Sequence, residues 1–287
     1  DEDVCTPVEL AARAAQGQPV ALEHVPDVAL DTRQRLDLVP LRIRHVPGGP
    51  RDVYYCAYFV TSAEAASIGA AIDHPALEGA WTQLRRRRLL NLGGEPAPGG
   101  MVPTGLPRFC QSLSRAVVDA GIFPEDKAPN HFLVNRYEVG EGLMPHFDGP
   151  LYHPRVAILS IGGPVALEFW QSIPHSVRGR PENGGELPAA SVICEHGSLL
   201  VFHGDAYTDF CHGIAERSRD AVHASVANSP QAAIAAELPL AGVGPTSRPP
   251  GGASADGTYA GELEHLVTLD RQTRVSITMR YVPLPGA

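Results

Sequence analysis

A histidine and an aspartate stand two residues apart at His146 and Asp148, a spacing that suits metal binding. On an extended segment the side chains at positions i and i+2 point to the same side, so both can reach one ion. A second histidine downstream would complete a set of two imidazoles and one carboxylate, which leaves coordination positions open and suits non-haem Fe(II). Spacing alone leaves several histidines for that role: His153, His175, His196, His203 and His212. The alternative is a structural His-x-Asp tripeptide, because such tripeptides are common.

The segment from Arg274 to Tyr281 carries a second set of residues suited to binding. In a strand, alternation places Arg274, Ser276, Thr278 and Arg280 on one face and apolar residues on the other. If the polar face is buried, it presents two guanidiniums flanked by hydroxyls, which can bind a dicarboxylate through bidentate hydrogen bonds. The simpler alternative is a half-exposed strand whose polar face meets water.

A strand predicted over residues 131–139 places Asn135 and Tyr137 on one face. Their amide and phenol groups stand close to the start of the His-x-Asp segment. On that face they could contribute to a binding site near His146. Ordinary strand polarity explains the pair equally well.

Trp81 stands just before four consecutive arginines, Arg85, Arg86, Arg87 and Arg88. An aromatic ring beside a short basic run suits single-stranded nucleic acid, through base stacking and phosphate contacts. The alternative is that the four arginines form a solvated face. Two further aromatic residues, Tyr152 and Tyr207, are candidates for the border of a binding site near His146.

The elements that must position these residues are mostly short strands. Strand-like runs separated by Gly and Pro turns cover residues 53–60, 131–139, 156–161, 165–170, 191–194, 198–202 and 274–282. Helices are predicted over residues 7–15, 61–72 and 107–120, the second opening with a capping box at Thr61 and Glu64. Many short strands with few intervening helices favour a β-sandwich or jelly roll.

Composition and charge narrow the class of protein. The chain has 287 residues, of which 44% are hydrophobic, enough for a sizeable core. A formal net charge of −9 argues against a protein that coats duplex DNA through its overall field. No run of 18 or more apolar residues is present, so no membrane span is predicted. The five cysteines are scattered and include no C-x-x-C pair, which favours a reducing compartment.

Together these motifs resemble the AlkB family of Fe(II)- and 2-oxoglutarate-dependent dioxygenases, from about residue 53 to residue 282. The matching segments are Asn135-Arg-Tyr137, Gly140-Glu-Gly, His146-Phe-Asp148, Gly197-Ser-Leu-Leu-Val-Phe202, His212-Gly-Ile and the pair Arg274 and Arg280. Segments such as Trp81-Thr-Gln-Leu and His146-Phe-Asp-Gly-Pro-Leu-Tyr152 resemble the subgroup of the sixth mammalian AlkB homologue in particular.

The resemblance implies a mainly β fold with flanking helices, built on a double-stranded β-helix (jelly-roll) core. Residues 1–50 form an N-terminal extension outside the resemblance. Residues 51–130 then correspond to a helical region with a nucleotide-recognition lid. Residues 131–287 correspond to the catalytic core, in which the Ala-, Gly-, Pro- and Ser-rich stretch over about 221–264 is expected to be a mobile insertion.

The resemblance also implies roles for individual residues. His146, Asp148 and His212 would hold Fe(II) and form the catalytic centre. Arg274 would pair with the distal carboxylate of 2-oxoglutarate, with other contacts to that co-substrate from Asn135, Tyr137, Ser276 and Arg280. Many relatives have Asn where this strand has Ser276, so the contact at that position is expected to differ.

The implied activity is oxidative demethylation or dealkylation of RNA or single-stranded DNA, with 2-oxoglutarate and O2 as co-substrates. The target base must come from a single strand or be flipped out of its stack. Trp81, Arg85 to Arg88, Tyr152 and Tyr207 are the candidate substrate contacts. We expect a monomer, free of membrane, in the cytoplasm or nucleus. The alternatives are the same chemistry on a protein side chain or small molecule, and a nucleic-acid-binding protein with a vestigial site.

Overall fold

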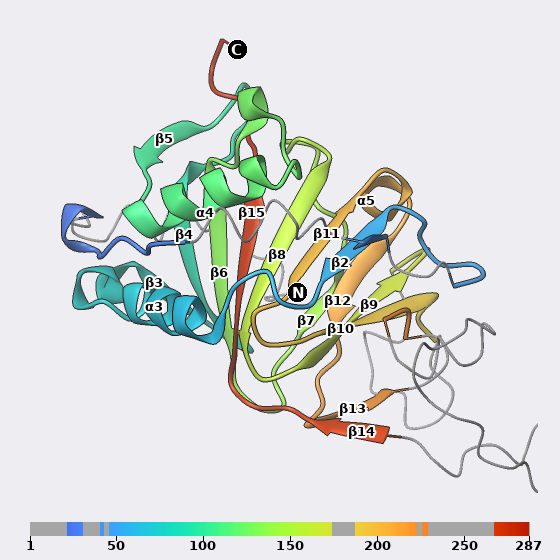
Figure 1. Cartoon of the computed structure of the whole chain (residues 1–287). Helices are drawn as coiled ribbons and strands as arrows, with labels where there is room; N and C mark the ends of the chain where they lie inside the picture. Colours follow the sequence, from blue (N-terminus) through green and yellow to red (C-terminus); the bar gives the residue numbers. More distant parts are fainter. Residues whose placement is uncertain are drawn as a thin grey trace, which may run out of the picture.

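Two antiparallel sheets face each other in the computed structural model, which describes residues 22–30, 41–42, 46–173, 187–222, 226–228 and 267–286 (Figure 1). The order of strands along the large sheet is β1 (Leu41–Arg42), β2 (Val53–Cys56), β11 (Leu199–His203), β8 (Arg155–Gly162), β15 (Arg274–Arg280), β6 (His131–Tyr137), β4 (Arg87–Glu95) and β3 (Trp81–Leu84). A further strand, β5 (Val102–Gly105), pairs with β4. The order along the second sheet is β10 (Ala190–Cys194), β9 (Val165–Trp170), β12 (Cys211–Ile214) and β7 (Leu143–His146). These facing sheets form the predicted jelly-roll core.

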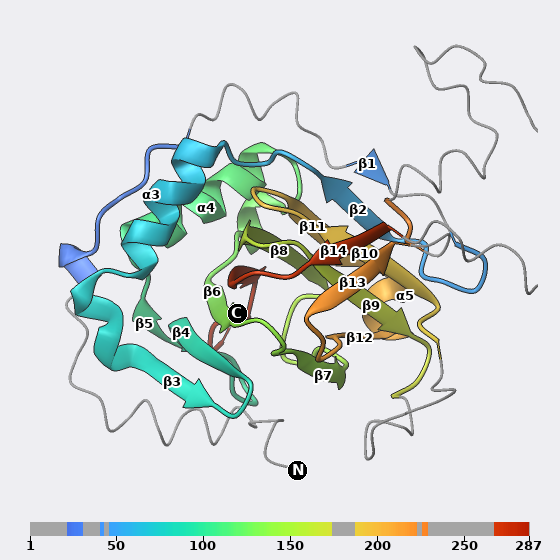
Figure 2. The same ribbon diagram turned by 90° about the horizontal axis from the view of Figure 1, so that it is seen from below.

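Helices α3 (Ser62–Ile72) and α4 (Arg108–Asp119) cover one face of the large sheet, and the second sheet lies on the other (Figure 2). Ile68 of α3 and Leu113 of α4 are fully buried in one core with Ile277 of β15. The predicted capping box starts α3: Thr61 Oγ1 accepts the Glu64 N–H at 3.2 Å, and the Thr61 N–H donates to Glu64 Oε2 at 2.8 Å. The short helices are η1 (Leu22–His24), η2 (Pro75–Ala80), η3 (Glu125–Lys127) and α5 (Asp205–Thr208).

A second core fills the space between the two sheets. Ile158 and Leu200 of the large sheet pack in it with Leu167 and Phe169 of β9. This core fixes the distance between the sheets. Side chains on the inner face of β15 can therefore approach residues of β7 and β12 without contact with bulk water.

Strand β15 lies in the middle of the large sheet and is paired on both sides. Ser276 stands opposite Asn135 of β6 and opposite Ser160 of β8. The apolar alternate positions, such as Ile277 and Met279, enter the core against the helices. The polar face of β15 is thus turned toward the second sheet, and the half-exposed alternative is wrong.

The strands and helices predicted in the described part of the chain are confirmed, with small shifts at their ends. The largest shift is at the end of β2, which the sequence predicts to reach residue 60. The strand ends at Cys56 because its pairing with β11 spans only Val53–Cys56. The helix predicted over residues 7–15 lies outside the described residues, as does most of the stretch 221–264. At the two ends of that stretch, β13 (Arg219–Val222), which includes its first two residues, pairs with β14 (Val267–Asp270), which follows it. The proposed division into three regions stays a prediction, although β2 and β4 share one sheet with β6 and β8.

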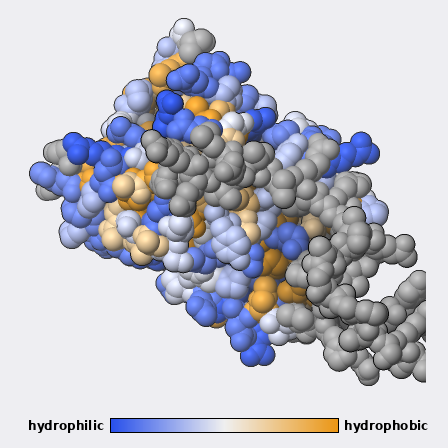
Figure 3. Space-filling view, in the orientation of Figure 1, coloured by the Kyte–Doolittle hydropathy of each residue, from blue (hydrophilic) through white to orange (hydrophobic). Residues whose placement is uncertain are grey.

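The described surface is mixed in character. Hydrophilic and hydrophobic patches are interspersed over the face in Figure 3. Within the ranges that the structure describes, the helices are too short or too polar to cross a bilayer.

Candidate metal and co-substrate site

Three potential metal ligands converge at the edge of the second sheet. His146 ends β7 and His212 lies on β12, and the two residues are direct cross-strand partners with ring centroids 4.4 Å apart. Asp148 follows two residues after the end of β7. One ligand atom from each of the three residues lies within 4.8 Å of the others, a spacing that a single divalent ion could bridge.

Three of the other four histidines that spacing allowed, His153, His196 and His203, have contacts elsewhere in the described structure. The His153 ring meets Tyr281 edge-on at 6.5 Å, and the His203 ring stacks on Tyr54 at 5.3 Å. His196 Nδ1 accepts the Gly162 N–H at 3.1 Å. His175 lies outside the described residues. Among the histidines that the structure describes, only His212 therefore completes the set with His146 and Asp148.

The two imidazoles are prepared as neutral donors. Burial lowers the pKa of His146, and burial together with the neighbouring His146 lowers the pKa of His212 to about 3. His146 Nδ1 lies 3.0 Å from the Met144 carbonyl oxygen, which favours the tautomer with a proton on Nδ1. The Nε2 lone pair of His146 is then free for a metal ion.

The carboxylate of Asp148 has one oxygen paired and one oxygen open. Arg280 Nη1 donates to Asp148 Oδ1 at 2.6 Å, while Oδ2 is buried without a partner in the described structure. Burial raises the pKa of Asp148, but the neighbouring charges, chiefly that of Arg280, outweigh burial and hold the pKa below its ordinary value. A buried, ionised and unpaired oxygen facing two neutral imidazoles fits a divalent cation.

Arg274 supplies the matching site for an anion. The residue is only 3% exposed, and its Nη2 donates to Ser160 Oγ at 2.9 Å. Its Nε and Nη1 are buried and have no partner among the described residues. A buried guanidinium without a carboxylate partner is costly to maintain, so its two open N–H groups fit an anionic ligand. The ring of Tyr137 lies beside it, 5.7 Å from Arg274 Cζ.

One cavity of about 390 Å³ joins these groups. The potential metal ligands lie on one side, and the polar face of β15 lies on the other. Residues predicted as co-substrate contacts all line it: Asn135, Tyr137, Arg274, Ser276 and Arg280. Apolar side chains such as Ile158, Leu167 and Ile214 complete the wall. The structure thus brings together the residues that two distant sequence motifs contribute.

The four consecutive arginines do not share one face. Arg85 is exposed, Arg86 pairs with Glu216, and Arg88 donates to Glu78 Oε1 at 3.0 Å. Arg87 is 8% exposed, lines the cavity and donates from Nε to Asn135 Oδ1 at 3.0 Å. The substrate contacts predicted for the run stay a prediction, but its four side chains do not form one uniform surface. The reason is that β4 begins at Arg87, so successive side chains point to opposite faces of the sheet.

The aromatic candidates lie in three different places. The Trp81 indole packs against Arg88 and Arg136, with Cζ atoms 5.1 and 5.3 Å from its ring. Tyr152 lines the cavity and covers Arg280. Tyr207 is mostly buried, and its hydroxyl donates to the Gly149 carbonyl at 2.8 Å, which anchors the loop after Asp148.

Sequence reasoning overlooked three residues of the cavity region: Ser160, Phe147 and His131. Ser160 could have been found from strand register, because it stands opposite Ser276. Phe147 lines the cavity and is 41% exposed, which marks the mouth near the Asp148 loop. His131 is 2% exposed and stands opposite Arg280 on β6, and no pattern in the sequence distinguishes it from an ordinary strand residue.

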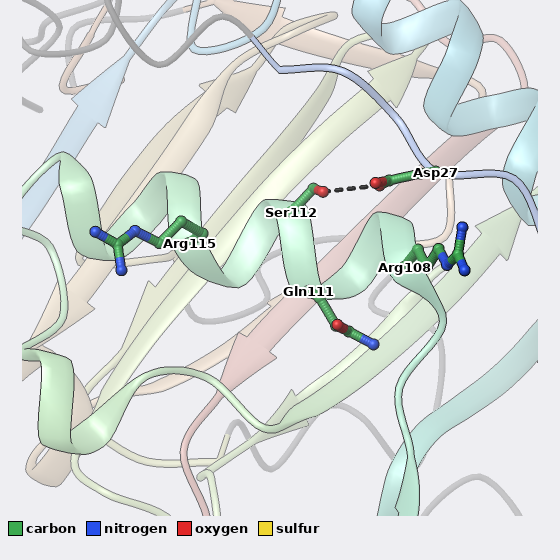
Figure 4. Close-up of a pocket in the computed structure, with 5 residues that line it drawn as sticks. All are labelled: Asp27, Arg108, Gln111, Ser112 and Arg115. Carbon is green, nitrogen blue, oxygen red and sulfur yellow. Dashed lines mark hydrogen bonds between the residues drawn. The ribbon is translucent and has the colours of Figure 1, made fainter. Parts of the chain in front are cut away.

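A separate depression of about 410 Å³ lies along α4, where Ser112 Oγ donates to Asp27 Oδ1 at 2.8 Å (Figure 4). Arg108, Gln111 and Arg115 complete its lining. This depression is on the helix layer and shares no residue with the cavity that contains the potential metal ligands.

Comparison with known proteins agrees with this geometry. The model of the 2OG-Fe(II) oxygenase superfamily matches residues 90–280. A protein of Danio rerio named "Probable RNA/DNA demethylase ALKBH6" is 33% identical over 238 residues, which cover 83% of this chain and 88% of that protein. The chain belongs to the AlkB proteins of the 2OG-Fe(II) oxygenase superfamily. It is thus an oxidoreductase, a dioxygenase that uses Fe(II) with 2-oxoglutarate and O2.

Other relatives of this oxygenase are more distant. The tRNA (carboxymethyluridine(34)-5-O)-methyltransferase alkbh8 of Xenopus tropicalis is 24% identical over 82% of this chain, which spans 32% of that longer protein. Among solved structures, "The structure of OsALKBH1" has 15% identity and a TM-score of 0.46, with 81% of this chain and 98% of that chain covered.

Proposed function

We propose that this oxygenase removes methyl or other alkyl groups oxidatively from bases of RNA or single-stranded DNA. The observation that carries the proposal is one cavity lined by both Asp148 and Arg274, in which Asp148 Oδ2 and the Nε and Nη1 of Arg274 are buried without partners among the described residues. The name of the Danio rerio relative, which refers to RNA and DNA, supports the substrate class. The cytoplasmic or nuclear location and the monomeric state stay predictions.

In this proposal His146, Asp148 and His212 would hold Fe(II). The imidazoles contribute neutral lone pairs, and Asp148 contributes its open Oδ2 while Arg280 retains Oδ1. Arg274 would bind the distal carboxylate of 2-oxoglutarate through its open Nε and Nη1. When bound, Fe(II), 2-oxoglutarate and O2 would supply the oxidising chemistry that converts an N-methyl group to a hydroxymethyl group and 2-oxoglutarate to succinate and CO2, with one oxygen atom of O2 in each oxidised product.

The remaining residues orient the co-substrate and limit access to it. Ser160 fixes the third nitrogen of Arg274, so the guanidinium enters the reaction already oriented. Ile158, Leu167 and Ile214 keep water from the bound groups, which strengthens the charge interactions there. The hydroxymethyl product on a base nitrogen then loses formaldehyde to leave the unmodified base.

The mouth of the cavity is where a base would enter. Phe147 and Pro150 are the two exposed residues of its lining, and both are apolar. An apolar mouth suits a flat base that has left its stack. Among the arginine run, the exposed Arg85 is the candidate for a phosphate contact.

A product assay tests the proposal. We expect N-methylated single-stranded RNA or DNA oligonucleotides to yield formaldehyde and succinate in equal amounts, and Asp148→Ala to yield neither. Formaldehyde from an N-methylated peptide but from no oligonucleotide would replace the nucleic-acid substrate with a protein one. Failure to form succinate with any of the substrates tested would favour a vestigial site.

A further inference from the structure

Tyr152 lies over the guanidinium of Arg280. Arg280 Cζ is 4.0 Å from the centroid of the Tyr152 ring, the shortest such distance among the cation–ring pairs of the described residues. Both side chains line the cavity, and Arg280 is only 5% exposed. A cation that is largely removed from water gains more from a ring face than a cation at the surface. The contact is therefore a candidate for an energetic role inside the site.

The guanidinium that Tyr152 covers has few other restraints. Arg280 Nη1 donates to Asp148 Oδ1, while Arg280 Nε is buried with no partner among the described residues. Direct hydrogen bonds thus fix only part of the group. The ring face of Tyr152 restrains its plane, and that plane decides whether Nη1 points at Asp148.

His131 supports the Tyr152 ring from the neighbouring strand. It stands opposite Arg280 in the β6–β15 pairing, and its ring centroid lies 5.6 Å from that of Tyr152. Tyr152 itself lies on the loop that follows Asp148, and the Tyr207 hydroxyl holds this loop through the Gly149 carbonyl. The ring is thus packed in place between the metal-ligand loop and the large sheet.

We infer that Tyr152 is a positioning residue for the metal centre, whose ring holds Arg280 on Asp148 Oδ1 so that Oδ2 stays directed at the metal ion. This inference rests on the metal-binding role proposed above for Asp148. It assigns Tyr152 to the metal centre, whereas the sequence suggested a contact with the nucleic-acid substrate. The ring, and not the hydroxyl, is the part of Tyr152 that matters.

Metal titration of the full chain separates the two roles. We expect Tyr152→Leu to weaken Co(II) binding about tenfold, measured by the visible absorption of the bound ion without co-substrate or nucleic acid. Tyr152→Phe retains the ring face and should bind Co(II) within about twofold of the wild type. The absorption spectrum of Co(II) in Tyr152→Leu should also shift, because the carboxylate ligand is less restrained.

Tyr281→Leu is the matched control. Tyr281 follows Arg280 directly, but its ring packs against His153 and it does not line the cavity. The same loss of an aromatic ring there should leave Co(II) affinity within about twofold of the wild type. If Tyr152→Leu does not unfold cooperatively, Tyr152→Met, which fills more of the same volume, replaces it.

A double-mutant cycle with Arg280→Met, which removes the cation, completes the test. Because the effect of Tyr152 acts through the guanidinium, Tyr152→Leu should change Co(II) affinity less than about twofold in that background. Wild-type affinity in Tyr152→Leu, or an equal loss with and without Arg280, would overturn the inference. Failure of the wild type to bind Co(II) would instead overturn the proposed metal site.

Discussion

Two groups of buried charged residues lie next to the second sheet. They differ in whether all their polar side-chain atoms have hydrogen-bond partners. The first is the cavity, with Arg87, Arg274, Arg280 and Asp148. The second, here called the closed cluster, consists of Glu168, Arg217, Asp220 and Arg271. The closed cluster balances two cations with two anions. The cavity has three guanidiniums to one carboxylate, and both signs of charge retain unpaired atoms.

The closed cluster satisfies its buried atoms internally. Asp220 is fully buried and accepts hydrogen bonds from Arg217, from two nitrogens of Arg271 and from the Ala166 N–H. Arg217 also donates to Glu168 Oε1 at 2.8 Å. No buried polar side-chain atom of these four residues lacks a partner in the described structure.

The difference indicates what each group contributes. The paired charges join β9 to the β13–β14 strand pair, which is a structural role. The unpaired charges in the cavity lower the stability of the protein until a ligand pairs with them, as is common at functional sites. The same residue types therefore have a structural role in the closed cluster and a binding role in the cavity. The presence or absence of unpaired polar atoms distinguishes the two.

The largest effect on stability should come from breaking the closed cluster. Asp220→Ala leaves Arg271 buried without its carboxylate, so we expect the free energy of unfolding to fall by about 3–5 kcal/mol in urea titrations. Asp270→Ala is the control, because the Arg219–Asp270 pair is exposed and should contribute about 0–1 kcal/mol. Equal effects of the two substitutions would show that the closed cluster is not structural.

The cavity should respond in the opposite way. Arg274→Met removes a cation that has no carboxylate partner. We therefore expect the free energy of unfolding without ligand to be unchanged or slightly higher. Calorimetric binding of 2-oxoglutarate to the metal-loaded protein should weaken by at least about 100-fold, because two charge-assisted hydrogen bonds are lost. A stability loss comparable to that of Asp220→Ala would remove the distinction between the two groups.

The loss of stability at acid pH should show a smaller effect of Asp220. Burial raises the pKa of Asp220, but the hydrogen bonds and charge of Arg271 outweigh it, and the folded-state pKa is lower than the ordinary value. The unfolded chain therefore binds a proton more readily, and this contribution is complete above about pH 4 and lost as the pH falls through the folded pKa. Compared with wild type, Asp220→Asn should lack this slope, which is at most about 1.4 kcal/mol per pH unit. Parallel curves below pH 4 would contradict the prediction.

Much of the fold and of the site could be predicted from the sequence because both rest on local patterns. Alternation along β15 correctly placed Arg274 and Ser276 on one face, and the i, i+2 spacing placed His146 with Asp148. The choice of His212 came from resemblance, since spacing did not distinguish it from its competitors. The position of His212 depends on tertiary structure, because β12 pairs with β7 in a register that places His212 opposite His146.

Other features depend on contacts that no local pattern contains. The inward direction of Arg87 follows from the residue at which β4 begins, and helix or strand propensity does not specify that residue. The Tyr152 ring meets Arg280 only because the loop after β7 returns to the large sheet. The closed cluster joins residues about 50 positions apart, among them Asp220 and Arg271, and no local sequence pattern pairs them.

The central claim is that His146, Asp148 and His212 bind Fe(II) next to a 2-oxoglutarate held by Arg274. Anaerobic absorption spectroscopy tests it most directly, because 2-oxoglutarate chelated to Fe(II) gives a weak visible charge-transfer band. We predict this band in the wild type and its loss in His146→Ala, with the unfolding transition retained. A wild-type protein that shows no band at saturating Fe(II) and 2-oxoglutarate, or an unchanged band in His146→Ala, would contradict the account.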